Sequence, residues 1–119
     1  MVKLKTAGPV LASLNILESV HFYEDKLGFS RTFCDEGYGI VVRDNIPIHF
    51  WLCDDKIFPK NTSCYIYVES GVDELFAEYE PRGVIHPNSK LEDHQWGSRE
   101  FAILDNFGNL IRFGQNINQ

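Results

Sequence analysis

The sequence of 119 residues lacks several features that would place it in a specialised class. It contains no run of about 18 apolar residues, which is the length that a membrane-spanning helix needs. Its first residues, 1–8, include no long apolar segment of the kind that secretory signals contain. Cysteine is scarce, and Cys34, Cys53 and Cys64 form no Cys-x-x-Cys pair. An odd number of cysteines without a secretory signal indicates reduced thiols, so we expect a cytoplasmic protein that contacts no membrane.

A basic excess is also missing, because the net charge at pH 7 is −6. This acidity argues against a nucleic-acid partner, since binding to phosphates needs a positively charged surface. It is compatible with a cationic ligand and equally with a surface that is acidic only for solubility. The chain contains no nucleophile elbow, no phosphate-binding loop and no dinucleotide fingerprint. With 44% hydrophobic and 24% charged residues, it has the composition of a soluble globular protein.

What the sequence does contain is a partial internal repeat. Residues 40–45 and 101–106 each run from an apolar segment into Asp-Asn, and an apolar segment follows in both cases. The length predicts one domain, residues 1–119, built from two copies of one unit. The predicted parts are a first module at about 9–53, a linker at about 54–61 and a second module at about 62–116.

The first module reads as strand, helix and three strands. Asn15 and Glu18 have the spacing of a capping box at a helix start, and Gly28 is a typical helix stop. Between them, Ile16, Val20, Tyr23 and Leu27 recur at helical spacing, which predicts their burial. The strands of this module are predicted at residues 10–14, 29–35, 38–43 and 46–53.

The second module repeats this order. Ser70 is expected to begin a helix that places Val72, Leu75 and Phe76 on one face, and Pro81 is expected to end it. The predicted strands are residues 63–68, a weak strand at 84–89, and residues 99–104 and 109–115, with a loop at 91–97.

The helix of each module covers one face of its sheet and leaves the other face open. One helix packed beside mainly antiparallel strands makes α+β the predicted class. We expect two such modules to form a curved mixed sheet, and curved sheets that face each other leave a concave groove lined by alternate side chains. Function is therefore expected in that groove.

Four segments carry a resemblance to a known family: residues 8–11, 22–31 (Phe-Tyr followed by Leu-Gly-Phe), 41–44, and 96–102 (Trp-Gly-x-Arg-Glu-Phe-Ala). On these the chain resembles the bleomycin resistance proteins of the vicinal oxygen chelate superfamily, which also includes glyoxalases and extradiol dioxygenases. The similarity extends over nearly the whole chain, and the last segment is the most specific. It implies the glyoxalase/bleomycin resistance fold, in a strand-swapped homodimer whose N-terminal strand crosses to the partner near Pro9.

Enzymes of this superfamily hold a divalent metal between strands of the two modules. The resemblance aligns Gly8, His49, Ser63 and Arg112 with the four ligand positions. Only His49 is a competent ligand, and the guanidinium of Arg112 would repel a cation. We therefore expect neither a metal nor another cofactor, and no catalytic residue.

The resemblance implies that the protein is not an enzyme. It implies a protein that confers antibiotic resistance by stoichiometric sequestration of bleomycin-type glycopeptides, whose flat bithiazole stacks on aromatic rings in grooves between subunits. Acidic residues near the groove rims would attract the cationic tail; these are Asp35, Glu36, Asp54, Asp55, Glu92 and Asp93. The expected ligand-binding residues are Phe33, Asp35, Tyr38, His49, Trp51, Phe58, Ser63, Tyr65, Trp96, Gly97 and Arg112.

Alternatives remain open at this stage. Phe33 and Tyr65 alternate along strands and fit a core position as well as a ligand contact. Trp51 fits a dimer interface equally well, whereas Trp96 lies in a polar loop and is harder to explain as core. The alternative functions are a metal-dependent glyoxalase- or dioxygenase-like enzyme, and a binder of another flat aromatic metabolite with the same fold.

Overall fold

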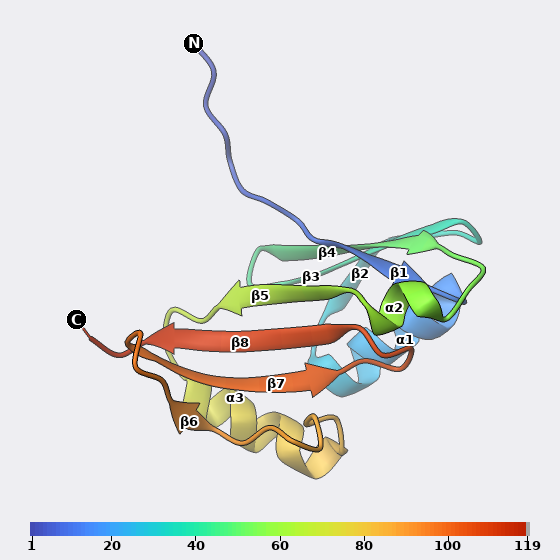
Figure 1. Cartoon of the computed structure of the whole chain (residues 1–119). Helices are drawn as coiled ribbons and strands as arrows, with labels where there is room; N and C mark the ends of the chain where they lie inside the picture. Colours follow the sequence, from blue (N-terminus) through green and yellow to red (C-terminus); the bar gives the residue numbers. More distant parts are fainter. Residues whose placement is uncertain (119) are drawn as a thin grey trace.

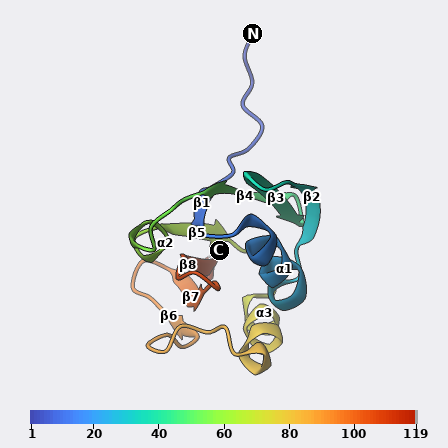
Figure 2. The same ribbon diagram turned by 90° about the vertical axis from the view of Figure 1, so that its right-hand side faces the viewer.

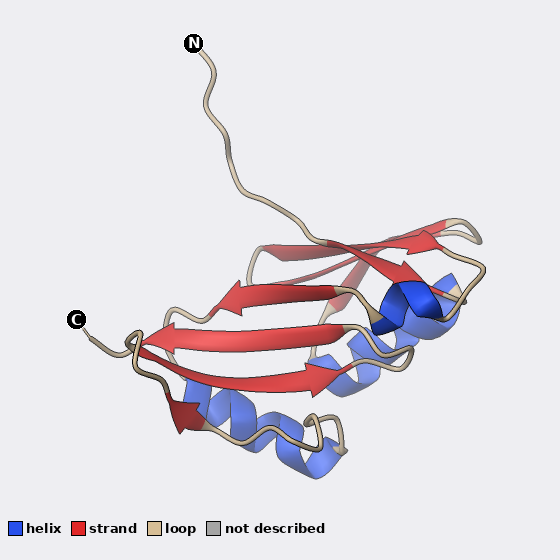
Figure 3. Ribbon diagram, in the orientation of Figure 1, coloured by secondary structure: helices blue, strands red, loops and turns tan. Residues whose placement is uncertain are grey.

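The computed structural model describes residues 1–118, in which eight strands form two four-stranded sheets (Figures 1 and 3). No helix in this part of the chain is long and apolar enough to cross a membrane. The elements in chain order are β1 (Val10–Ser13), α1 (Ile16–Leu27), β2 (Ser30–Cys34), β3 (Tyr38–Arg43), β4 (Ile46–Leu52), α2 (Ile57–Lys60), β5 (Ser63–Tyr67), α3 (Val72–Tyr79), the short 3-10 helix η1 (Glu80–Arg82), β6 (Glu92–Asp93), β7 (Ser98–Leu104) and β8 (Leu110–Asn116).

The two sheets have the same topology. Sheet A has the strand order β1-β4-β3-β2, and sheet B has the order β5-β8-β7-β6. In each sheet the strand before the long helix pairs in parallel with the last strand, and the remaining pairs are antiparallel. The predicted α+β class and the repeated strand-helix-three-strand order are confirmed.

Helix α1 begins and ends as its sequence predicts. The side chain of Asn15 accepts a hydrogen bond from the backbone N–H of Glu18 at 3.0 Å, and Gly28 ends the helix with a φ of 78°. Ile16, Val20 and Leu27 are buried on the face that the helical spacing indicates. Tyr23 is buried there too and donates a hydrogen bond to the carboxylate of Asp105 at 2.8 Å.

Two sequence predictions in the second module need correction. Ser70 does not cap α3, because the residue before the helix is Gly71 in a left-handed conformation and Gln115 accepts the Val72 N–H instead. Residues 84–89 form no strand beyond a single bridge between Ile85 and Ile103, because the chain turns where the backbone N–H groups of Asn88 and Ser89 hydrogen-bond back to His86.

The other two differences are short elements inside expected loops. The predicted loop at 91–97 contains β6, which pairs with β7 and is reinforced by a 2.6 Å hydrogen bond from Arg99 to Asp93. The predicted linker at 54–61 contains α2, whose start is held by the side chain of Asp55 accepting the N–H of Ile57.

One continuous hydrophobic core joins the two sheets and both long helices. It contains Phe50 of sheet A and Phe113 of sheet B, together with Val20 of α1 and Tyr79 of α3. Since the inner faces of both sheets share this core, their opposite faces look outward, as the end-on view shows (Figure 2). Residues 1–7 extend away from this body as an arm (Figure 1).

Candidate functional site

The outward faces of the two sheets carry most of the predicted site residues. On β4, Ile48 and Phe50 are buried in the core, so the alternating His49 and Trp51 lie on the opposite side. On β5 the same alternation places Tyr65 and Tyr67 opposite the buried Ile66. The sheet A face is the outward side of sheet A, with Phe33, Tyr38, His49, Trp51 and the adjoining Phe58. The sheet B face is the outward side of sheet B, with Ser63, Tyr65, Tyr67, Trp96, Glu100 and Arg112.

The sheet A face holds two aromatic pairs. The Tyr38 hydroxyl lies 2.8 Å from Nδ1 of His49, and the two rings meet edge to face. The rings of Trp51 and Phe58 also meet edge to face, with centroids 5.3 Å apart. Phe33, Trp51 and Phe58 are each more than a third exposed, so none of them is an ordinary core residue.

Four acidic residues follow strands of sheet A, two of them after β2 and two after β4. Asp35 lies in the turn between β2 and β3, and one of its carboxylate oxygens accepts the backbone N–H groups of Gly37 and Tyr38. It therefore holds the turn that positions Tyr38, while Glu36, Asp54 and Asp55 are exposed.

The sheet B face is organised around the carboxylate of Glu100. Its Oε2 accepts hydrogen bonds from the hydroxyl of Tyr65 at 2.6 Å, from Nε1 of Trp96 at 2.9 Å and from the hydroxyl of Ser98. Nε2 of His94 lies 3.8 Å from the other oxygen, Oε1. Glu100 is only 4% exposed although Trp96 beside it is 71% exposed.

The hydrogen bonds decide the charge state of this cluster. Burial would raise the pKa of Glu100, but the hydrogen bonds from Ser98, Tyr65 and Trp96, with the nearby His94, outweigh burial and lower its pKa. Burial and the hydrogen bond to Glu100 raise the pKa of Tyr65, so its proton stays on the phenol. Glu100 is therefore an anion that accepts from neutral donors at neutral pH.

Gly97 and two further predicted residues complete the sheet B face. Gly97 adopts a φ of 91°, which favours glycine, and its N–H and C=O bond to His94 and Ile117. This turn presents Trp96 next to the start of β7. Ser63 and Arg112 are exposed, and Arg112 pairs with Tyr65 across β5 and β8.

The two faces of one chain do not meet. Among residues 1–118, the aromatic contacts of the sheet A face and those of the sheet B face form separate sets. Both faces look outward from the shared core, whereas the sequence led us to expect two sheets facing each other. Residues 1–118 also contain no group of three or more His, Cys, Asp or Glu side chains placed to hold a metal ion.

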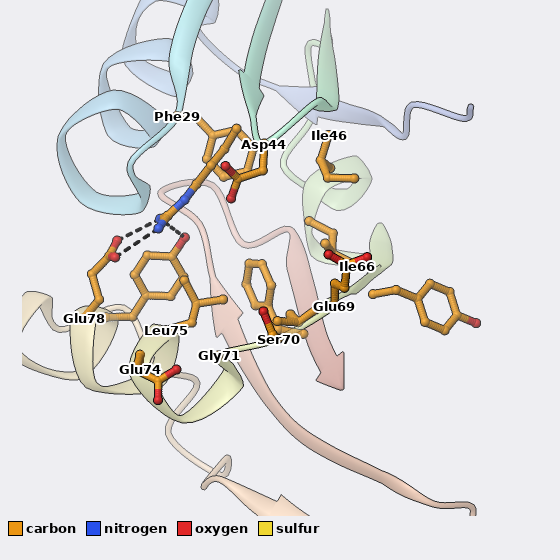
Figure 4. Close-up of a pocket in the computed structure, with 15 residues that line it drawn as sticks. Phe29, Asp44, Ile46, Ile66, Glu69, Ser70, Gly71, Glu74, Leu75 and Glu78 are labelled. Atoms are coloured by element: carbon orange, nitrogen blue, oxygen red, sulfur yellow. Dashed lines mark hydrogen bonds and ion pairs between the residues drawn. The ribbon is translucent and has the colours of Figure 1, made fainter. Parts of the chain in front are cut away.

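A large cavity lies elsewhere, between the modules on the helix side, and has a volume of about 770 Å³ (Figure 4). None of the predicted site residues lines it. Arg43 reaches across it from sheet A to α3, where it donates two hydrogen bonds to the carboxylate of Glu78, at 2.8 and 3.0 Å, and one to the hydroxyl of Tyr79. This cavity is therefore part of the junction that ties the two modules together.

Sequence reasoning missed Glu100 and Tyr67 of the sheet B face, and His94, which stacks on Trp96 beside it. Glu100 is not among the ligand-binding residues that the sequence predicts. Its position was nevertheless readable, because a strand that buries Phe101 must turn residue 100 to the open side. The signal that could have identified Glu100 is an acidic residue placed between a loop tryptophan and an apolar strand segment.

Comparisons with known proteins agree with this architecture. No family model matches the chain. The bleomycin resistance protein of Geobacillus stearothermophilus is 34% identical, and the match covers 92% of this chain and 95% of that relative. The structure of the bleomycin-binding protein from bleomycin-producing Streptomyces verticillus, complexed with copper(II)-bleomycin, matches with a TM-score of 0.83 at 32% identity, covering 95% of this chain and 97% of that chain.

A third relative is the bleomycin resistance determinant encoded on the transposon Tn5, whose structure matches with a TM-score of 0.81 at 26% identity. That match covers 95% of this chain and 98% of the relative, so both modules take part in it. The shared architecture and the identity over nearly the whole length show that the chain belongs to the bleomycin resistance protein family, with the glyoxalase/bleomycin resistance fold.

Proposed function

We propose that this protein binds bleomycin-type glycopeptides and confers resistance by holding them, without altering them chemically. The observation that carries this proposal is the pair of outward sheet faces, on which exposed aromatic rings surround fixed polar groups. Trp51, Phe58 and Trp96 are all partly or largely exposed, and rings of this kind bind flat heteroaromatic groups by stacking. The relatives at 34% and 32% identity are a bleomycin resistance protein and a bleomycin-binding protein, which supports the same ligand.

The ligand site is proposed to form between two copies of the chain. Each copy presents its sheet A face and its sheet B face outward, so neither face is covered within one chain. A twofold dimer that sets the sheet A face of one protomer against the sheet B face of its partner encloses two equivalent grooves. The arm before Pro9, with exposed Val2 and Leu4, is free to cross to the partner.

Within each groove, the site residues take distinct proposed roles. Phe33, Trp51, Phe58, Tyr65 and Trp96 supply ring surface, and the polar groups fix the ligand's orientation. The polar groups are Asp35, Tyr38, His49, Ser63 and Arg112, with Gly97 shaping the loop.

The acidic rim is smaller than the sequence suggests, because two of its members have cationic partners. Asp93 is paired with Arg99, and Glu92 lies 3.8 Å from Lys90. Asp35, Glu36, Asp54 and Asp55 have no such partner among the described residues. We propose that these four attract the cationic tail and mainly speed association.

The protein is proposed to act in the cytoplasm. All three cysteines are free thiols, and Cys53 is buried close to the backbone oxygen of Asp55. Free thiols suit a reducing compartment.

Equilibrium dialysis with metal-free bleomycin tests the proposal. We expect about one drug molecule per chain, released unchanged when the complex is denatured. Chemically altered drug after incubation with a trace of protein would show that the protein is an enzyme. A failure to bind bleomycin, together with binding of another flat aromatic compound, would leave the fold assigned and change the ligand.

A further inference from the structure

The indole of Trp96 is held in one orientation although most of its surface is open. Its Nε1–H donates to Oε2 of Glu100 at 2.9 Å. One face of its ring lies against the imidazole of His94, with centroids 4.4 Å apart and planes inclined by 16°. Trp96 is nevertheless 71% exposed, so the other ring face is free. A loop Trp that is anchored at its nitrogen and covered on one side has already lost most of its rotational freedom.

Glu100 is itself fixed by its surroundings. Its carboxylate is buried at 4% exposure and receives the hydroxyl groups of Tyr65 and Ser98 in addition to the indole. Space for this arrangement depends on Gly114, which pairs with Glu100 across β7 and β8. A methyl group at position 114 would overlap the Tyr65 hydroxyl and would lie 3.1 Å from Cγ of Glu100. The anchor of Trp96 is thus built from four strand positions: Tyr65, Ser98, Glu100 and Gly114.

We propose that Glu100 and His94 are positioning residues that make Trp96 a one-sided stacking platform for a flat aromatic group of the ligand. This inference rests on the proposed function and adds the geometry of the contact. The ligand ring lies on the face of Trp96 that His94 leaves free. Because the indole is oriented before binding, less conformational entropy is lost when the ligand stacks on it.

A double-mutant cycle separates positioning from direct contact. Glu100→Ala is expected to weaken binding of metal-free bleomycin about tenfold, a change typical of losing a hydrogen bond to a charged group. In a Trp96→Ala background the same change is expected to weaken binding less than about twofold, because Glu100 acts through Trp96. Equal effects of Glu100→Ala in both backgrounds would mean that Glu100 contacts the drug itself, and would overturn the inference.

Two conservative variants sharpen the cycle. Glu100→Gln keeps an acceptor for the indole while removing the charge, so it is expected to retain most of the affinity for bleomycin. A loss of affinity as large as that of Glu100→Ala would mean that the charge of Glu100 acts as a counter-ion to the cationic drug. Glu80→Gln is the matched control, since Glu80 is an exposed carboxylate on η1 with no side-chain hydrogen bond or ion pair among the described residues. We expect it to leave affinity within about twofold of wild type, inside the range of additivity errors.

His94→Ala tests which ring face the ligand uses. Loss of the imidazole frees the indole to tilt, so binding is expected to weaken several-fold. Tighter binding by His94→Ala would show that the drug displaces His94 from Trp96, and the one-sided platform would be wrong.

A measurement without ligand tests the positioning of Trp96 independently of whether the protein binds bleomycin. Hydrogen exchange of the indole N–H, followed by NMR, is expected to be slow for Trp96 in the wild type, fast in Glu100→Ala and intermediate in Glu100→Gln. Trp51 serves as an internal reference. Equal exchange of Trp96 in wild type and Glu100→Ala would refute the positioning role. Slow exchange in the wild type would support the anchored orientation of Trp96. If Trp96→Ala nevertheless bound bleomycin with unchanged affinity, Trp96 would not be a stacking platform for the ligand.

Discussion

Trp96→Ala is the substitution that tests the ligand site most directly. The indole is 71% exposed and contacts His94 and Glu100 at the surface of sheet B. Its removal takes no side chain out of the hydrophobic core. The substitution should therefore change ligand binding far more than stability.

The expected loss of affinity follows from the ring face that His94 leaves uncovered. A tryptophan offers about 150–250 Å² for burial, and a ligand stacked on one free face covers roughly 80–100 Å² of it. At about 25 cal/mol per Å², this area corresponds to roughly 2–2.5 kcal/mol. Alanine scanning of aromatic anchors gives a similar range, so we expect a loss of about 1–3 kcal/mol, or roughly a 5- to 150-fold weaker Kd.

Isothermal titration with metal-free bleomycin measures this change, and thermal unfolding of the same samples measures stability. Leu17→Ala is a suitable control, because Leu17 is an exposed apolar residue on α1, which covers the inner side of sheet A. We expect it to leave the Kd unchanged. An unchanged Kd for Trp96→Ala, together with a collapse of Tm, would show that Trp96 supports the fold and that the ligand site lies elsewhere.

Three further predictions concern metal, assembly and pH. Treatment with a chelator should leave the affinity for metal-free bleomycin unchanged; a loss that zinc restores would contradict a metal-free site. Light scattering at micromolar concentration should report a dimer, and a stable monomer with full affinity would contradict a shared groove. The hydrogen bond from Arg43 lowers the pKa of Glu78, so its contribution to stability is present above about pH 4.5 and is lost as the pH falls through the lowered pKa. Urea unfolding should therefore find Glu78→Gln less stable than wild type by about 1 kcal/mol at pH 7. The difference should vanish at low pH, and a constant difference would show that the pair is not the cause.

Much of the fold was predictable because local signals agreed with the final structure. Asn15, Gly28 and the spacing of Ile16, Val20 and Leu27 define α1 without reference to the rest of the chain. The two Asp-Asn sequences that mark the internal repeat act differently in the structure. Asp44 and Asn45 both have positive φ in a two-residue hairpin. Asp105 instead accepts three backbone N–H groups, from Phe107, Gly108 and Asn109, in a longer turn.

The site was only partly predictable, because hydrogen bonds between distant residues organise it. Alternation along the strands identified the open side for Trp51 and Tyr65. It could not reveal that Tyr65, 35 positions before Glu100, shares that carboxylate with Trp96. Nor could it reveal the direction of the open faces, since that depends on how the two modules pack.

The packing of the modules fixes the position of each open face, and this links the core to the ligand site. Tyr79 donates a 2.6 Å hydrogen bond to the backbone oxygen of Leu27, and Asn109 donates one of 2.8 Å to that of Ala12. With the contact between Tyr23 and Asp105, these buried bonds tie each module to the other at several points. In a twofold dimer, the angle between the two faces of one chain sets the width of both grooves. In the proposed dimer, the buried polar contacts between the modules would therefore set the groove width, although none of them lies on a face that would contact the ligand.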